Sequence, residues 1–506
     1  MINGLICGCY NKFIRAGAIQ SPCSIFTKQK SIKMKKIGGI LLGFIILSAC
    51  SKKIKATHHH NHNSHQHVHY ASESNIPAHK LIFPSKTPDR IIVSLTEDPN
   101  HSFAVNWRTS QEIDTAYVQI AKETHGPDFL LDNSMQQIIA TTEFIQVENI
   151  RDHEPLVNAA YHSAIVKNLI PNTTYVYRVG DGGKNDDTWS EWFQLTTPST
   201  NQNEPFSFIY FGDAQNDVKS MWSRVIRKSY KMMPEVDFML HAGDLINHSE
   251  SDREWGEWFY AGSFIHATVP SIMTPGNHEY DKSVNRTKLS SLWRPQFTLP
   301  ENGPLEELKE TCYTLDYQNM KLISIDAQSF NNSERSRKAQ TKWLDSVLAN
   351  NHKKWITLTM HYPIFSTAKG RDNKELRESL KPLIDKYNVD LVLQGHDHTY
   401  ARGYASNEGL GKTIVKDAGA VYAVSVSGPK MYESQDQDWM VKRGEYVQLF
   451  QIITVENDTI HYNSYTTKGN VYDSFSLIKD ENGNKELINN ASEINIRLKK
   501  DFVKGR

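Results

Sequence analysis

The chain has 506 residues, which is long for one domain, because domains usually hold about 100–200 residues. Hydrophobic residues make up 39% of it, enough for a large core, and 57 Lys and Arg balance 57 Asp and Glu. A net charge of zero argues against a polyanion-binding face, so we expect no nucleic-acid-binding surface. Any affinity for phosphate must be local.

The first fifty residues have the pattern of an export signal. Met34-Lys35-Lys36 is basic, and the apolar run Ile37 to Leu47 is too short to span a bilayer. The end of this segment, Leu47 to Cys50, resembles the lipobox of bacterial lipoproteins, which implies lipidation of Cys50 and a membrane-anchored periplasmic or cell-surface protein. We therefore expect a signal peptide over 34–50 and a wrongly assigned extension over 1–33. The alternative is a cytosolic protein with an apolar N-terminal element.

Cysteine usage is compatible with export but supplies no covalent framework. Only Cys312 lies beyond Cys50, so the mature chain cannot form an internal disulfide. The fold must then rest on its core and on any metal it binds.

A polar stretch over 51–87 follows and is rich in histidine: His58, His59, His60, His62, His65, His67 and His69. It has no apolar face to bury, so we expect a disordered tether. A plain spacer and a segment that gathers zinc, copper or nickel both fit this composition.

Residues 88–198 show short alternating runs separated by turn residues, the pattern of an antiparallel sandwich. The predicted strands are 90–95, 103–109, 116–121, 161–166, 174–179 and 192–196. Val105 to Thr109 and Leu169 to Gly180 resemble a fibronectin type III-like domain. No catalytic group of residues stands out in this part.

From 205 to 480 apolar strands alternate with amphipathic helices, which predicts an α/β domain. The predicted strands are 206–211, 236–241, 271–274, 321–325, 355–360, 389–393 and 421–426, with helices at 338–348 and 374–387. Residues 481–506 are set apart as a polar tail.

Polar residues follow directly after five of these strands. They are Asp213, Asp244, Asn277, His361, and the pair His396 and His398. In an open α/β sheet the carboxyl ends of the strands meet at one edge, so separate segments can converge there. Carboxylate, amide and imidazole groups without a thiolate suit hard and borderline metals and exclude a zinc finger. Any single cluster, taken alone, is more simply interpreted as a turn with capping side chains.

The five clusters together resemble the calcineurin-like metallophosphoesterase superfamily. With the preceding sandwich, over about 88–470, the chain resembles purple acid phosphatases. The resemblance implies an α/β sandwich of mixed sheets flanked by helices. It also implies two metal ions: Asp213 and His398 hold the first, Asp244 bridges, and Asn277, His361 and His396 hold the second.

The same resemblance implies roles for neighbouring residues. His278 would contact phosphate and protonate the leaving oxygen, for which imidazole has a suitable pKa range. Glu279, Tyr400 and Arg402 match the edges of the motifs, where hydrogen bonding or packing is expected.

Two positions depart from the family pattern. Purple acid phosphatases carry a tyrosine where this chain has Asn247, and the wider superfamily often has a histidine where it has Gln215. Without phenolate or imidazole, ferric iron and a purple colour are not expected. Gln215 and Asn247 remain candidate oxygen donors, and a divalent pair such as Mn, Zn or Fe is expected.

The resulting hypothesis is an acid phosphatase-like phosphomonoesterase that uses a hydroxide held by two metals. A phosphodiesterase or nucleotide hydrolase is one alternative, and a surface-tethered binding protein with a degenerate scaffold is another. His241 and His248 flank the second cluster, and four tryptophans could wall a cleft, but packing roles are the simpler interpretation. These tryptophans are Trp222, Trp255, Trp258 and Trp293.

Overall fold

The computed structural model describes residues 83–147, 156–183, 186–404 and 412–501, all within one compact unit of the chain, 64–506. The expected extension, the signal segment, Cys50 and the histidine-rich stretch through His69 lie outside the described residues. Among the described helices, none has the length and apolar character needed to cross a membrane.

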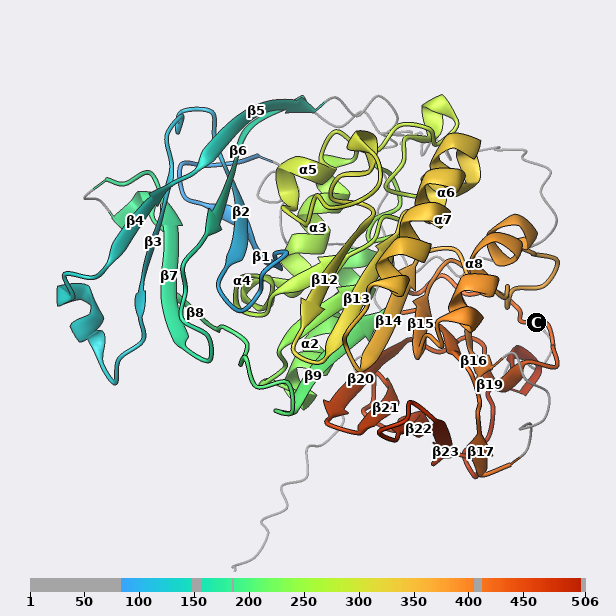
Figure 1. Cartoon of the computed structure of the whole chain (residues 1–506). Coiled ribbons are helices and arrows are strands. Elements are labelled where there is room, and N and C mark those ends of the chain that lie inside the picture. The colour runs from blue at the N-terminus through green and yellow to red at the C-terminus, as the bar shows by residue number, and fades with distance from the viewer. Residues whose placement is uncertain (1–82, 148–155, 184–185, 405–411, 502–506) are drawn as a thin grey trace, which may run out of the picture. The chain divides into compact units, whose positions relative to one another are not determined.

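The N-terminal part is a sandwich of two four-stranded layers, as predicted (Figure 1). One layer contains β1 (Asp89–Leu95), β2 (Phe103–Thr109), β6 (Val157–Val166) and β5 (Thr141–Val147); the other contains β4 (Gln136–Ile139), β3 (Tyr117–Lys122), β7 (Thr174–Gly180) and β8 (Phe193–Thr196). Inward-facing side chains such as Trp107 and Tyr177 form its core. The sequence pattern did not predict β4 and β5, because both strands are largely exposed and so lack a regular apolar face.

The first sheet of the α/β domain begins with three parallel strands, β9 (Phe206–Phe211), β10 (Phe238–His241) and β11 (Ser271–Met273). Antiparallel strands extend it on the β9 side: β20 (Leu449–Glu456), β21 (Thr459–Thr466), β22 (Val471–Lys479), β23 (Lys485–Asn489) and β17 (Ile414–Lys416). β23 falls within the stretch set apart as a polar tail, and it pairs with β22.

The second sheet faces the first and is mixed. Its order is β12 (Tyr313–Tyr317), β13 (Met320–Ile325), β14 (Trp355–Met360), β15 (Leu391–Gln394), β18 (Val421–Val424), β16 (Tyr400–Tyr404) and β19 (Met440–Gly444). Side chains of both sheets meet in one core that includes Phe208, Tyr313 and Leu393. Helices α6 (Ala327–Asn332), α7 (Glu334–Ala349) and α8 (Lys374–Lys386) cover the outer face of the second sheet (Figure 1). This is the expected arrangement of mixed sheets flanked by helices.

Helices on the other side cover the first sheet. They are α2 (Ser223–Met232), α3 (Asp252–Gly262), α4 (Phe264–Thr268) and α5 (Trp293–Gln296), with a π-helical turn at Val218–Trp222. The four tryptophans Trp222, Trp255, Trp258 and Trp293 are fully buried here. They pack the core and do not wall a cleft.

The sandwich and the α/β domain share a sheet. β1 pairs with β11 in parallel at Ser94 and Ser271, so one continuous sheet of twelve strands runs from β17 to β5. Beside this junction Arg90 donates to both carboxylate oxygens of Asp252, at 2.8 and 2.7 Å, and all of these groups are buried. A buried bidentate ion pair of this kind fixes the geometry between the two parts.

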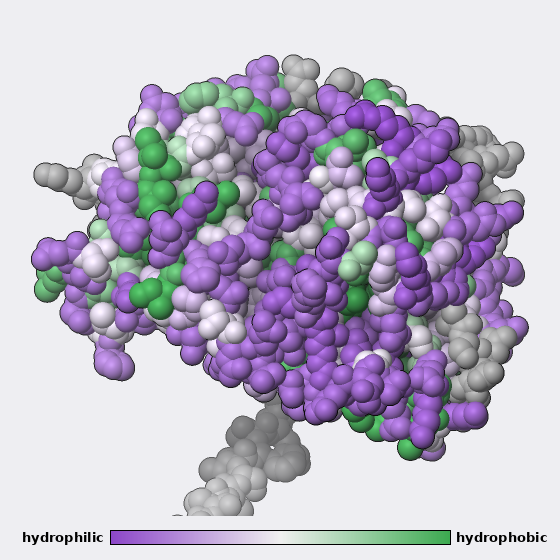
Figure 2. Space-filling view, in the orientation of Figure 1, coloured by the Kyte–Doolittle hydropathy of each residue, from purple (hydrophilic) through white to green (hydrophobic). Residues whose placement is uncertain are grey.

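Exposed apolar side chains are concentrated on the sandwich. Figure 2 shows hydrophobic patches there, while the α/β domain presents a mostly hydrophilic face in this view. Leu131, Ile139 and Phe144 are exposed by 85%, 65% and 54%.

Candidate metal centre

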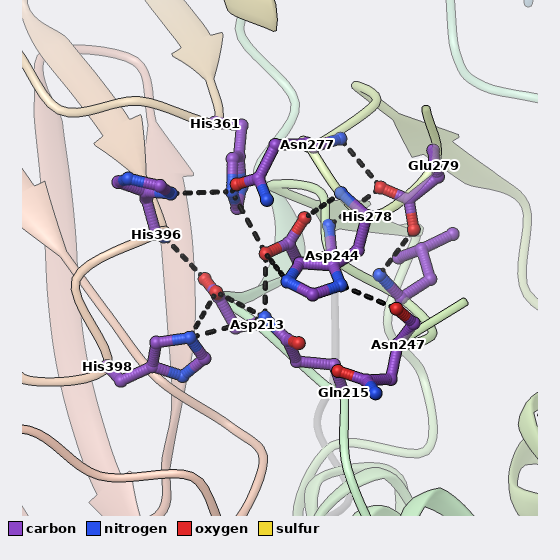
Figure 3. A network of polar contacts seen from close by, with 12 residues as sticks. Asp213, Gln215, Asp244, Asn247, Asn277, His278, Glu279, His361, His396 and His398 are labelled. Carbon is purple, nitrogen blue, oxygen red and sulfur yellow. Dashed lines mark hydrogen bonds and ion pairs between the residues drawn. The ribbon is translucent and has the colours of Figure 1, made fainter. Parts of the chain in front are cut away.

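The six predicted ligands lie together at the carboxyl ends of the parallel strands. Figure 3 shows their side chains pointing toward one another. Each follows β9, β10, β11, β14 or β15, so the two facing sheets bring five segments to one place. The chain is very tight here: a Cβ on Gly276 would lie 2.2 Å from Asp244 Oδ1, and one on Gly395 would lie 2.4 Å from Asp213 Oδ1. Glycine is therefore required at both positions.

One group of donors consists of Asp244, His361 and His396, whose ligand atoms lie within 4.8 Å of one another. His361 Nε2 is 3.2 Å from Asp244 Oδ2, 3.2 Å from His396 Nδ1 and 3.2 Å from Asn277 Oδ1. Two imidazoles, a carboxylate and an amide oxygen thus surround one position. This donor set fits a divalent metal ion.

A second group consists of Asp213, Asp244 and His398, again within 4.8 Å. The amide nitrogen of Gln215 lies among them, 2.6 Å from Asp244 Oδ2, 3.2 Å from His398 Nε2 and 3.5 Å from Asp213 Oδ2. Its Oε1 is buried and has no hydrogen-bond partner in the described structure. A half-turn of the amide would present this oxygen to a cation instead. The group therefore fits a metal with Gln215 as a neutral donor.

Asp244 belongs to both groups, as a bridging ligand must. His361 Nδ1 donates to the carbonyl of Ala242 at 2.9 Å, which leaves the lone pair of Nε2 for a metal. Asp213 Oδ1 accepts the backbone N–H of His396 at 2.6 Å, which ties the two groups together.

Without a metal ion, protons balance the buried carboxylates of the centre. Burial, together with Asp244, raises the pKa of Asp213 to about 7. Burial lowers the pKa of His361, but Asp244 and Asp213 outweigh it and raise that pKa to about 9. Burial holds the pKa of His396 and of His398 well below the usual value, so both are neutral ligands. A divalent ion would displace the proton of His361 and take over the neutralisation of Asp213 and Asp244.

The backbone at the centre is strained. Asp244, His396 and His398 have φ of 51°, 74° and 47°, a region that residues other than glycine adopt at a cost. Glu279 holds two of the loops, because its carboxylate accepts the N–H of Asp244 at 2.9 Å, Leu245 at 2.8 Å and Gly276 at 2.7 Å. It supports the ligands without being one.

His278 lies at the edge of the centre with its side chain 15% exposed. Its N–H donates to Asp244 Oδ1 at 2.8 Å, and Nδ1 donates to the carbonyl of Asn247 at 2.6 Å. Nε2 remains available for a substrate, 3.9 Å from Asp244 Oδ2. Burial lowers the pKa of His278 to about 4.

Asn247 acts on the centre through its backbone carbonyl, which accepts the hydrogen bond from His278. Its side-chain amide lies 3.3 Å from the His248 ring, and His248 in turn pairs with Glu254 at 2.7 Å. Within the described residues, the Asn247 side chain forms no hydrogen bond with the six ligands. His241 stacks on Phe211 in the aromatic core. Neither His241 nor His248 joins the ligand groups.

The other two motif-edge residues also support the fold. Tyr400 donates to Asp473 at 2.7 Å, and Arg402 forms a bidentate pair with the same buried carboxylate at 2.9 and 2.7 Å. They anchor β16 to β22, as expected for positions that hydrogen bond and pack.

Sequence reasoning missed Lys430 and Tyr432. The Tyr432 ring lies edge-on to His398, with ring centroids 4.7 Å apart, and Lys430 lies over Tyr432. The positive charge of Lys430 contributes to the low pKa of His398 and of His278. The available signal was Gly428-Pro429-Lys430, a turn sequence that follows β18 at the same edge of the sheet.

Arg286 was missed as well. It donates to the carbonyl of Asn277, and its charge also lowers the pKa of His278. No local pattern marks this residue, because it lies in a loop nine positions after its partner.

Comparison with known proteins gives matches over both parts of the chain. Residues 88–197 match the purple acid phosphatase N-terminal domain, and residues 206–400 match the calcineurin-like phosphoesterase domain. An uncharacterized protein of Mycobacterium tuberculosis is 24% identical over 61% of this chain and 60% of its own length. A probable inactive purple acid phosphatase of Arabidopsis thaliana is 24% identical over 63% and 58%. Acid phosphatase type 7 of Danio rerio is 23% identical over 64% and 78%.

Solved structures share the fold. A purple acid phosphatase from yellow lupin seeds superposes with a TM-score of 0.65 at 17% identity, over 78% of this chain and 75% of that one. PhoD gives a TM-score of 0.56 at 14% identity, over 81% and 95%. The chain spans about three fifths of the length of the first curated relatives it matches, 60% and 58%.

Proposed function

We propose that the chain hydrolyses phosphate monoesters with the help of two metal ions, because residues 206–400 match the calcineurin-like phosphoesterase domain and residues 88–197 match the purple acid phosphatase N-terminal domain. The observation that carries this proposal is the pair of donor groups that share Asp244, each with its ligand atoms within 4.8 Å. A single metal or a structural site would not require this shared carboxylate.

The chemistry divides between the metals and the chain. When bound, a pair of divalent ions lowers the pKa of water and neutralises phosphoryl charge. The six ligands and Gln215 would hold these ions, and Glu279 orients two of the ligand loops. His278 would donate a proton from Nε2 to the leaving oxygen, and the carbonyl of Asn247 orients its ring. A phosphate dianion beside His278 raises its pKa from the low value it has in the free protein.

The experiment measures metal content by elemental analysis and hydrolysis of a chromogenic monoester and diester. We expect two metals per chain and faster turnover of the monoester. Asp244→Asn should lose both metals and turnover, because one bridging charge is removed. Asp237→Asn, directly before the same strand β10, is the matched control and should keep both. A folded Asp244→Asn protein with full turnover would overturn the proposal, and faster diester turnover would overturn its monoester part.

His278 is tested separately from the ligands. His278→Ala should keep its metals, while kcat falls by about 10²–10⁴-fold, the usual contribution of a general acid. Equal loss of metal and activity would show that His278 is a ligand or a structural residue instead.

The binding-protein alternative predicts a damaged centre. Two of the relatives bear the name probable inactive purple acid phosphatase, so loss of activity within such chains is conceivable. The complete donor set of this chain supports an active enzyme.

We also propose which metals the protein binds and where in the cell it is located. With Asn247 in place of a phenolate donor, we expect a colourless protein with Mn, Zn or Fe(II), checked by its visible spectrum and elemental analysis. Export and anchoring through Cys50 predict incorporation of a labelled fatty acid. A Cys50→Ser chain should not incorporate it; equal labelling of both chains would rule the anchor out.

A further inference from the structure

A basic pocket of about 420 Å³ lies beside the metal centre. Its walls come from the turn after β9, helix α2, the loop after β18, the β21–β22 turn and the C-terminal segment. The charged lining residues are Arg224, Lys430, Lys468 and Arg497, opposed by Asp217. Excess positive charge in a concave site favours an anionic ligand.

Two residues that line the pocket are sequence neighbours of the ligand group that contains Asp213, Asp244 and His398. Asn216 and Asp217, which line it, follow directly after Gln215 and have φ of 69° and 47°. Two consecutive strained residues at such a place suggest a functional constraint. Across the pocket, Gly428 donates to the carbonyl of Asp213 at 2.5 Å, which places the loop that carries Lys430 against the same ligand. Figure 3 shows Asp213, Gln215 and His398 on one side of the centre. The pocket lining continues from this side through Asn216, the residue after Gln215.

Three of the cations are available to a ligand. No carboxylate pairs with Arg224, Lys430 or Lys468 within the described ranges; Arg224 donates to Thr467 Oγ1 at 2.6 Å, and Lys430 lies over a tyrosine ring. Asn216 Oδ1 is buried and has no partner in the described part of the chain. Arg224 and Lys468 are exposed, so their charges face solvent, and a half-turn of the Asn216 amide would present its NH₂ group to an anion.

We propose that this pocket binds a second anionic group of the substrate. The preferred substrates are then phosphate esters whose alcohol part carries another phosphate or a carboxylate. The reacting phosphate lies at the metal centre, and the second anion lies among Arg224, Lys430 and Lys468. This inference rests on the proposed function, because it concerns the substrate of the same site.

The expected effects are moderate, since the pocket is open to solvent. Each cation should contribute about two- to fivefold to binding, as exposed ion pairs usually do. The contribution should fall as salt is added, because mobile ions screen exposed charges over about 10 Å at 0.1 M.

The experiment compares matched substrates: the monophosphates and bisphosphates of short linear diols, and a phosphate ester of a hydroxycarboxylic acid. For the native protein, kcat/KM should be about tenfold higher for the best bisphosphate than for its monophosphate, as two or three such cations would give. Arg224→Gln combined with Lys468→Gln should remove most of this ratio. Lys231→Gln is the matched control, because Lys231 is exposed on the same helix and does not line the pocket; it should leave the ratio unchanged. The carboxylate ester shows whether the pocket requires phosphate or accepts any anion.

A native protein that shows no preference for a second anion, or a preference that survives the double substitution, overturns the inference. The proposed function fails separately, if no phosphate ester is hydrolysed by the metal-loaded protein. In that case calorimetry with methylenebisphosphonate decides: binding weakened by the double substitution supports the pocket, and binding unaffected by it refutes the pocket.

Discussion

Glu279 offers the sharpest test of how the metal centre is held. Its Oε2 accepts the N–H of Asp244 and of Gly276, and its Oε1 accepts the N–H of Leu245. In Glu279→Gln one of the two oxygens becomes an NH₂ group. Whichever way the amide turns, at least one buried N–H then faces a donor.

The magnitude follows from these bonds. A buried group left unsatisfied costs about 1–3 kcal/mol, and the remaining bonds lose the assistance of a charge. We expect Glu279→Gln to lower the free energy of unfolding by about 2–4 kcal/mol. The loops that carry Asp244 and Asn277 lose their common anchor, so metal affinity should fall by about 10–100-fold.

Urea unfolding of the metal-free protein measures the first effect, and titration against a metal chelator measures the second. Glu310→Gln is the matched control, because Glu310 is buried in the segment before β12 and, within the described part of the chain, contacts no metal-ligand loop: it accepts the backbone N–H of Leu299 at 3.3 Å and pairs with Arg294 at 3.6 Å. It should lose less stability and keep its metal affinity. A Glu279→Gln protein that is destabilised but binds metal as tightly as the native protein would refute the anchoring role.

Two further predictions concern the sandwich. Asp252→Asn breaks the buried ion pairs with Arg90 at 2.7 Å and Arg108 at 3.2 Å, so the free energy of unfolding should fall by about 3–5 kcal/mol in a urea titration. Asp89→Asn is the control, because Asp89 is a partly exposed partner of Arg108, and it should lower the free energy of unfolding by less. An equal loss in both variants would contradict the special role of Asp252. Burial lowers the pKa of His162 to about 4 from 6.5. As the pH falls below 6.5, the unfolded chain therefore binds a proton at this residue before the folded chain does. The resulting loss in the free energy of unfolding is absent above pH 6.5 and reaches about 3 kcal/mol as the pH falls toward 4. His162→Gln should therefore show a shallower loss of unfolding free energy between pH 6.5 and 4.5, and an unchanged slope would show that His162 does not titrate in this way.

The fold class and the ligand set were predictable because both depend on local patterns. Strands such as β9 and β14 are buried along their whole length and mostly apolar, so their bounds agree with the prediction. The polar residue that follows such a strand lies beyond the apolar core, at the carboxyl end of the strand. That rule brings Asp213 and His361 to one edge without knowledge of the packing between the sheets.

Local patterns fail where a strand or a contact depends on distant residues. β4 and β23 contain many polar or exposed positions, so no alternation marks them before they pair with a neighbour. Arg90 and Asp252 are 162 positions apart, and only the packing of β1 beside α3 makes them an ion pair.

The sequence by itself determined which residue types could bind metal, and only the tertiary structure decided what each departure from the family pattern does. Gln215 and Asn247 are both amides and both follow a ligand loop. In the structure the Gln215 side chain points toward the metal ligands and contacts Asp244, whereas Asn247 contributes its backbone carbonyl, which accepts a hydrogen bond from His278. The basic pocket likewise combines segments from residues 216 to 497. Side-chain direction and such combinations depend on long-range packing, which no local pattern contains.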